Sequence, residues 1–76
     1  MVQSSMTTSQ ARERLLTAAV EQAMRGGIAD MSLRELAAAI GTSHRMLIYH
    51  FGSREGLLAA VARTVEEAQR LSLIHI

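Results

Sequence analysis

Apolar residues recur every three or four positions along most of this sequence, a spacing that predicts helices and not strands. The first periodic segment predicts a helix over residues 10–25, with Ser9 as its N-cap and with Gly26 and Gly27 as the residues that end it. The apolar stripe of this helix is expected to consist of Leu15, Leu16, Ala19, Ala23 and Met24.

The second periodic segment has the clearest start signal. Ser32 precedes Glu35 by three residues, which is the capping-box pattern: the serine hydroxyl accepts the backbone N–H of the glutamate, and the carboxylate accepts that of the serine. Met31 and Leu36 stand where a hydrophobic staple would close the same end. We expect this helix to end at Gly41, because glycine adopts the left-handed conformation of helix ends without a steric penalty.

Two more helices are expected downstream. A short third helix begins at residue 42 or 43 and ends at residue 50 or 51, and a fourth runs from residue 54 to about residue 70. Gly52 and Ser53 separate them by breaking and re-capping the chain, and the stripe of the fourth helix is Leu57, Leu58, Val61, Val65 and Ala68. The predicted fold class is all α, with a core of Leu15, Leu16, Ala19, Leu36, Ala37, Ile40, Leu47, Phe51, Leu57 and Val61.

The second and third segments together reproduce the spacing of a helix-turn-helix. A small residue, Ala37, stands where two helices cross closely, and Gly41 supplies the tight turn between them. Leu36, Ile40 and Leu47 fill the corner on the inner side of that turn. Because a generic helical hairpin has a similarly loose pattern, the spacing alone leaves DNA binding and a purely structural hairpin as equal alternatives.

The residues around this motif favour DNA binding. The stretch SLRELAAAIGTSHRMLIYHFGSREGLLAAV (residues 32–61) resembles the N-terminal DNA-binding domain of TetR-type (tetracycline-repressor) transcriptional regulators. That family combines a Ser- or Thr-capped second helix, a Gly–hydrophobic–Ser turn, a Leu-Tyr-x-x-Phe helix and a Ser-Lys/Arg-Glu cap before a Leu-Leu helix. Each motif alone is weak, whereas their combination is specific. The resemblance extends over residues 9–69 and rests on Leu15, Leu16, Ala18, Ala19, Gly27, Ser32, Arg34, Leu36, Ala37, Gly41, Ser43, Leu47, His50, Phe51, Ser53, Arg54, Glu55, Leu57 and Leu58.

The resemblance implies a three-helix, homeodomain-like helix-turn-helix bundle, with the motif at about residues 32–51, followed by the start of a fourth helix. It implies a sequence-specific transcriptional regulator, by family default a repressor, that reads an operator half-site in the major groove through the helix over residues 43–50. The expected DNA-binding residues are Arg34, Thr42, Ser43, His44, Arg45, Tyr49, His50 and Arg54.

The chemistry of these residues suggests different contacts. Arg45 can pair with guanine O6 and N7, while Ser43 and His44 can donate to purine or phosphate acceptors. By family position, Arg34 is a base or backbone contact and Arg54 is a phosphate contact. For both of these arginines the alternative is a solvated surface side chain without a role in DNA binding.

Several positions depart from the family pattern. Ile48 replaces the tyrosine that commonly contacts a phosphate, and Tyr49, about 100° further round the helix, cannot simply substitute for it. Arg45 stands where a small residue is often found, Thr42 replaces an apolar residue, and Ala23 replaces a common phenylalanine. These changes affect individual DNA contacts and leave the fold unaltered.

Composition agrees with the helical pattern and restricts the other chemistry. Apolar residues make up 49% of the 76-residue chain and aromatic residues only 3%, so the core must consist of aliphatic side chains. The absence of cysteine excludes disulfides and thiolate metal sites. The net charge of +1, from eight basic residues (all arginine) and seven acidic ones, neither demands nor excludes nucleic acid. The longest apolar run, residues 57–62, is too short to span a membrane, and residues 1–10 lack the features of a signal peptide.

Catalysis and metal binding are not expected. Ser43 and His44 are adjacent in sequence, which does not place a general base beside a nucleophile. His44 and His50 point to different faces of their helix, and no third ligand accompanies them. We therefore expect no enzyme activity, no metal and no cofactor, and we expect His50 either to pack near Phe51 or to contact a phosphate.

A second function class also fits the helical pattern, namely a small interaction module that dimerises through Leu58, Val61 and Val65 and binds no DNA. The family resemblance instead implies a cytoplasmic, nucleoid-associated protein whose partner is double-stranded DNA with a near-palindromic operator. In that family a larger C-terminal domain binds a small effector and forms a homodimer. This sequence lacks that domain, so we expect the chain by itself to be a monomer.

The two ends of the sequence differ from the segments between them. Residues 1–8 are polar and uncharged, and we expect them to form a flexible arm. Residues 71–76, LSLIHI, break the preceding Arg- and Glu-rich pattern and resemble a translated adapter peptide. The alternative interpretation of this tail is the ordinary apolar start of the next domain.

Overall fold

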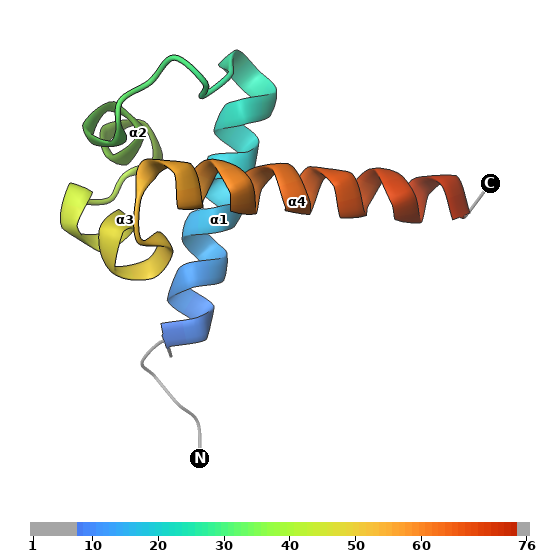
Figure 1. Ribbon diagram of the computed structural model, residues 1–76, viewed down its shortest axis with the longest axis horizontal. Coiled ribbons are helices and arrows are strands. Elements are labelled where there is room, and N and C mark those ends of the chain that lie inside the picture. Colours follow the sequence, from blue (N-terminus) through green and yellow to red (C-terminus); the bar gives the residue numbers. More distant parts are fainter. Residues whose placement is uncertain (1–7, 75–76) are drawn as a thin grey trace.

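The computed structural model describes residues 8–74, and this part of the chain contains four helices and no strand. Figure 1 shows α4 crossing α1, with α2 and α3 on one side of the crossing and the C-terminal half of α4 extending away on the other side. The predicted all-α class is confirmed. The bounds of the helices are α1 Thr8–Gly26, α2 Leu33–Ile40, α3 His44–Phe51 and α4 Arg54–Ile74.

The capping box predicted at the start of α2 is present. The Ser32 hydroxyl accepts the Glu35 backbone N–H at 3.1 Å, and Glu35 Oε1 accepts the Ser32 N–H at 2.8 Å. The helix ends where expected, at Gly41, whose φ of 80° places it in the left-handed region. Its N–H and that of Thr42 are directed at the carbonyl of Ala37, so the last turn of α2 is closed by backbone bonds.

Serines also cap the next two helices. The Ser43 hydroxyl accepts the Met46 N–H at 3.1 Å at the start of α3, and the Ser53 hydroxyl accepts the Gly56 N–H at 3.0 Å at the start of α4. Gly52, with a φ of 84°, ends α3 between these two caps. The third helix was predicted to begin at residue 42 or 43; it begins at His44, with Ser43 as its N-cap. The prediction that Gly52 and Ser53 break and re-cap the chain is confirmed.

The outer bounds of the first and last helices differ from the predictions. Ser9 is not an N-cap, because α1 begins at Thr8 and Ser9 lies inside the helix. The fourth helix does not end near Arg70 but continues to Ile74, since neither glycine nor proline follows Gly56 to interrupt it. Of the predicted arm and tail, residues 1–7 and 75–76 lie outside the described residues.

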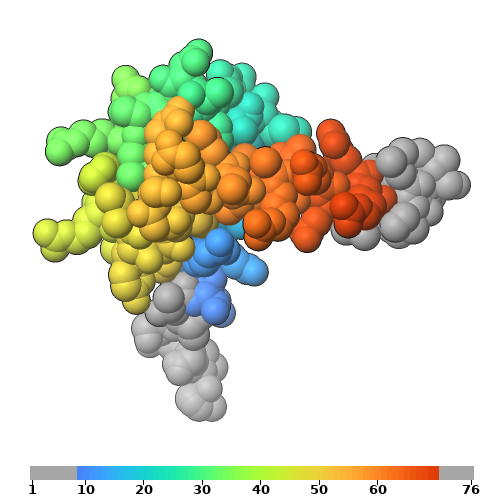
Figure 2. Space-filling view, in the orientation of Figure 1, coloured from blue at the N-terminus to red at the C-terminus, as the bar shows by residue number. Residues whose placement is uncertain are grey.

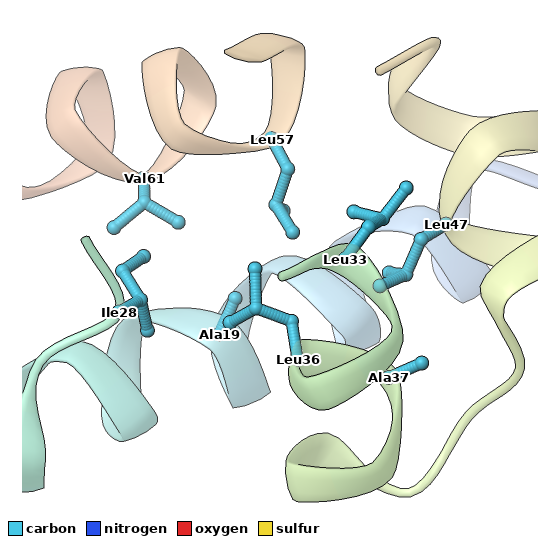
Figure 3. Packing of buried hydrophobic residues seen from close by; sticks show 8 residues of the cluster. All are labelled: Ala19, Ile28, Leu33, Leu36, Ala37, Leu47, Leu57 and Val61. Carbon is cyan, nitrogen blue, oxygen red and sulfur yellow. The ribbon is translucent and has the colours of Figure 1, made fainter. Parts of the chain in front are cut away.

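The core is a small cluster of aliphatic side chains to which all four helices contribute (Figure 3). Leu36, Leu47 and Leu57 are its largest fully buried members, one each from α2, α3 and α4, and they pack with the fully buried Ala19 of α1. Every residue of the predicted core either belongs to this cluster or packs against it. The prediction missed two buried residues, Ile28 and Ala60, and it placed Leu33 on the apolar side of the second helix without including it in the core.

The start of α4 approaches the end of α3 very closely at Gly56. A Cβ atom placed on Gly56 would overlap the backbone carbonyl oxygen of Phe51. Backbone atoms cannot rotate out of the way as a side chain can, so only glycine fits at this contact. Gly56 therefore sets the distance between α3 and α4.

We expect Leu47→Ala to unfold the domain or come close to it. The substitution leaves a cavity where α3 meets the core, which costs about 2–5 kcal/mol in the free energy of unfolding. A domain this small buries only about 60% of its unfolded surface and has little stability to lose. Thermal unfolding followed by circular dichroism measures the effect, with Met24→Ala as the control because Met24 is 74% exposed. A melting temperature of Leu47→Ala equal to that of the control would contradict the assigned core.

We expect Gly56→Ala to destabilise the protein, although alanine is the better helix former. Helix propensity alone favours alanine by about 0.5–1 kcal/mol, whereas overlap with the Phe51 carbonyl should cost about 1–3 kcal/mol. Chemical denaturation of both variants and the wild type measures the difference. Gly26→Ala is the matched control, because the nearest atom to its added Cβ is Gln22 Nε2 at 3.9 Å. Stabilisation by Gly56→Ala would show that α3 and α4 are not in contact at this point.

Candidate nucleic-acid interface

The outer side of α3 is determined by the burial of one residue. Leu47 is fully buried, so its side chain fixes the inner side of the helix. Arg45 and Tyr49, two positions before and after it, project on the opposite side and are exposed. Figure 2 shows side chains of the green and yellow segments, which include α2 and α3, projecting from one side of the molecule.

The N-terminus of α3 combines exposed side chains with free backbone donors. His44 and Arg45 are the first two residues of the helix and are both exposed. The backbone N–H groups of a helix's first turn have no intrahelical acceptor and lie at the positive end of the helix dipole. Ser43 uses its oxygen as the cap acceptor, so its hydroxyl hydrogen stays available to an outside acceptor. This end of α3 is therefore suited to an anion or to the acceptor edge of a base.

Two more of the expected residues lie in α2 and in the turn that follows it. Arg34 is exposed in the first turn of α2, beside the capping box. Thr42 is half-buried in the turn between α2 and α3, where its N–H donates to the Ala37 carbonyl at 2.9 Å. Thr42 thus has less surface to offer to DNA than Ser43.

The rings of Tyr49 and His50, near the end of α3, differ in their exposure to solvent. Tyr49 is 67% exposed, while His50 is half-buried and its Nε2 atom is buried without a hydrogen-bond partner. The His50 ring contacts the Tyr49 ring edge-on, with centroids 4.8 Å apart, and lies 6.4 Å from the Phe51 ring. Of the two alternatives for His50, packing near Phe51 is what the structure shows. A phosphate contact through Nε2 would require the imidazole to move out of this packing.

Sequence reasoning missed a cation–π contact at the same end of the bundle. The Arg12 guanidinium carbon lies 4.8 Å from the centroid of the Phe51 ring, so α1 is held against the end of α3. The spacing of α1 gives no signal for this contact, because the two residues are distant in sequence.

Arg54 has a structural role that its sequence position does not indicate. Its Nε donates to the Met31 carbonyl at 2.8 Å, and its Nη2 donates to the Ala29 carbonyl. Both acceptors lie in the loop between α1 and α2, so the half-buried guanidinium holds this loop against the start of α4. Arg54 is therefore anchored to the loop by its guanidinium and is not a free surface side chain. A phosphate contact stays a prediction and would have to use Nη1, which is engaged in neither of these two bonds.

The described residues contain neither a metal-binding cluster nor a membrane-spanning helix. No group of three or more His, Cys, Asp or Glu side chains between residues 8 and 74 could hold a metal ion. No helix in the described region is long and apolar enough to cross a bilayer.

Two short helices joined at a left-handed glycine, with α3 presenting a polar N-terminus, have the geometry of a helix-turn-helix. Residues 15–61 match the sequence model of the bacterial regulatory proteins of the tetR family, and the chain belongs to this family. Its members are DNA-binding transcription regulators without enzymatic activity, which decides against an interaction module that binds no DNA.

A curated relative supports the same assignment. The HTH-type transcriptional regulatory protein RaaS of Mycobacterium tuberculosis (strain ATCC 25618 / H37Rv) is 44% identical to this chain over 62 residues. The aligned segment covers 82% of this chain and 29% of that protein, so the chain spans less than a third of this relative's length. No solved structure matches the chain.

We expect Arg54→Lys to destabilise the protein although it preserves the charge. A lysine ammonium is a single point donor and cannot reproduce the two directed bonds of the guanidinium to the loop. Loss of these partly buried bonds should cost about 1–3 kcal/mol, measured by chemical denaturation. It should also speed hydrogen exchange at the Met31 amide, which donates to the Ile28 carbonyl within the loop.

The matched control for this substitution is Arg63→Lys. Arg63 is an exposed arginine on the same helix, so the exchange should leave stability within about 0.5 kcal/mol of the wild type. If Arg54→Lys is as stable as Arg63→Lys, the guanidinium does not hold the loop.

Proposed function

We propose that this chain is the DNA-reading domain of a transcriptional repressor and that it reads one operator half-site in the major groove with the first turn of α3. The observation that carries the proposal is the exposure of His44 and Arg45 at the N-terminus of a helix anchored from behind by Leu47. Family membership supports DNA binding as the activity. In the general docking mode of a helix-turn-helix, the second helix of the motif, which is α3 here, enters the major groove.

In this proposal Arg45 reads a base and its neighbours position the domain. The guanidinium of Arg45 presents the paired donors that match O6 and N7 of guanine. Ser43, His44 and the free N–H groups of the first turn of α3 donate to a phosphate or a purine acceptor. Tyr49, further along α3, contacts the sugar-phosphate backbone of the DNA. Arg34 and the Nη1 group of Arg54 contribute phosphate contacts from the sides.

The assembly that we propose is a two-fold dimer on a near-palindromic operator, in the cytoplasm at the nucleoid. Two copies of this domain, one helical turn of DNA apart, would read two half-sites. The length of the relative beyond the aligned segment leaves room for dimer-forming and effector-binding regions, which we assign to the longer regulator. The chain by itself should be monomeric at micromolar concentration, and a dimer in sedimentation velocity would contradict this.

We expect Arg45→Ala to weaken binding to a selected half-site by about 1–3 kcal/mol and to relax the preference at one base pair. Arg45→Ala and the wild type should bind a scrambled duplex equally tightly, because the specific base contact of Arg45 contributes nothing to binding that duplex. Fluorescence anisotropy at several salt concentrations measures both duplexes, with Arg63→Ala as the control for removing one positive charge from an exposed position.

The same titrations distinguish a base contact from a phosphate contact. A phosphate contact weakens selected and scrambled duplexes alike and contributes about one unit to the salt slope. Arg54→Ala should lower the slope in this way if Nη1 meets a phosphate, at a temperature where circular dichroism shows the variant folded. Equal weakening of both duplexes by Arg45→Ala would show that Arg45 contacts the backbone and reads no base.

A further inference from the structure

The outward surface of α3 contains more apolar surface than a solvent-facing helix needs. Four large hydrophobic side chains are exposed in the described part of the chain, and three of them lie on this eight-residue helix: Met46 (39% exposed), Ile48 (42%) and Tyr49 (67%). A helix facing only water places polar residues on its outer side. The outer side of α3 therefore has apolar chemistry that neither the core nor the base contact of Arg45 uses.

Ile48 lies next to Arg45 on this surface. Residues three apart in a helix are neighbours on the same face, and Ile48 follows Arg45 by three positions, one turn further from the N-terminus. It is also adjacent in sequence to the buried Leu47, so its Cβ position is fixed by the packing of the helix on the core. DNA bound by Arg45 would thus lie beside the aliphatic side chain of Ile48.

The chemistry of Ile48 limits what it can recognise. Its side chain has no polar atom and cannot donate to a phosphate or to a base acceptor. Tyr49 has a hydroxyl that can do both, and Met46 has a polarisable sulfur, so these two residues are less restricted. In the major groove, the apolar group that a base pair presents is the C5 methyl of thymine.

We propose that Ile48 is a specificity-determining residue that packs on a thymine methyl in the half-site. The inference rests on the proposed function, because it requires α3 to lie in the major groove. One helical turn advances 5.4 Å along α3 and successive bases are about 3.4 Å apart, so the thymine lies about one or two base pairs from the guanine that Arg45 reads. The half-site therefore combines a guanine with a nearby thymine.

The experiment begins with selection of duplexes from a randomised pool by the 76-residue chain at low salt, where backbone contacts are strongest. Each thymine of the selected half-site is then replaced by deoxyuridine, which removes only the methyl group. Burial of one methyl-sized group is worth about 0.8 kcal/mol, so the wild type should bind one deoxyuridine duplex about fourfold more weakly. Ile48→Ala should bind the thymine and deoxyuridine forms of that duplex equally.

Two variants serve as matched controls in the same titrations. Met46→Ala removes an exposed apolar side chain from the same helix, and Met24→Ala removes one from α1. Both should retain the fourfold preference for thymine. Circular dichroism of Ile48→Ala should match the wild type, because Ile48 is outside the buried core.

Three results would overturn the inference. The wild type could bind every deoxyuridine duplex as tightly as its thymine form, the preference could survive in Ile48→Ala, or it could disappear in Met46→Ala instead. In each case the Arg45→Ala substitution would still weaken binding to the selected duplex and leave binding to the scrambled duplex unchanged, so the proposed function would stand. Failure to select any duplex, with no salt-dependent binding, would overturn the proposed function and this inference together.

Discussion

The packing of three leucines on one alanine is the constraint on which the rest of the structure depends. Leu36, Leu47 and Leu57 come from α2, α3 and α4, and they pack with Ala19 of α1. The small side chain of Ala19 permits the helices to approach closely. Helices of eight residues are not stable alone in water, so α2 and α3 exist because of this contact. The orientation of α3 relative to the other helices follows from the burial of Leu47. Stability and the presentation of Arg45 thus have one physical cause.

Short-range and long-range contacts then complete the positioning of α3. At its N-terminus the Ser43 cap aligns the first turn, and at its C-terminus Gly56 allows α4 to approach the Phe51 carbonyl. Arg54 connects the start of α4 to the loop before α2. Because α2 also packs against α3 in the core, the loop before α2, α2 itself, α3 and the start of α4 are all connected by contacts. The outer side of α3 is held in place from both ends.

Most of the fold could be predicted from the sequence because its signals are local. The capping box of Ser32 and Glu35, the left-handed Gly41 and the helical spacing of the leucines each depend on residues within one or two turns. Ile28 was missed because it lies in a loop, where no periodicity marks a buried residue. The end of α4 was misplaced because a change in composition near residue 70 resembled a stop signal but contains no helix-breaking residue.

The candidate site was less predictable, because exposure and long-range bonds are properties of the packed chain. Position in the motif was sufficient to nominate Ser43, His44 and Arg45, all of which are exposed. No local pattern indicates that Arg54 reaches the carbonyls of Ala29 and Met31, which precede it by more than twenty residues. The same limit applies to the burial of His50 Nε2, which results from the packing of α3 on its neighbours.

The exposure of Tyr49 also determines how this protein can be observed. The chain has one tyrosine and no tryptophan, so its intrinsic fluorescence comes from a ring that is already 67% in contact with solvent in the folded state. Unfolding changes the surroundings of that ring little, whereas a partner covering the outer side of α3 would change them directly. The emission of the protein is therefore a natural optical reporter of α3, and it carries almost no information about the leucine core.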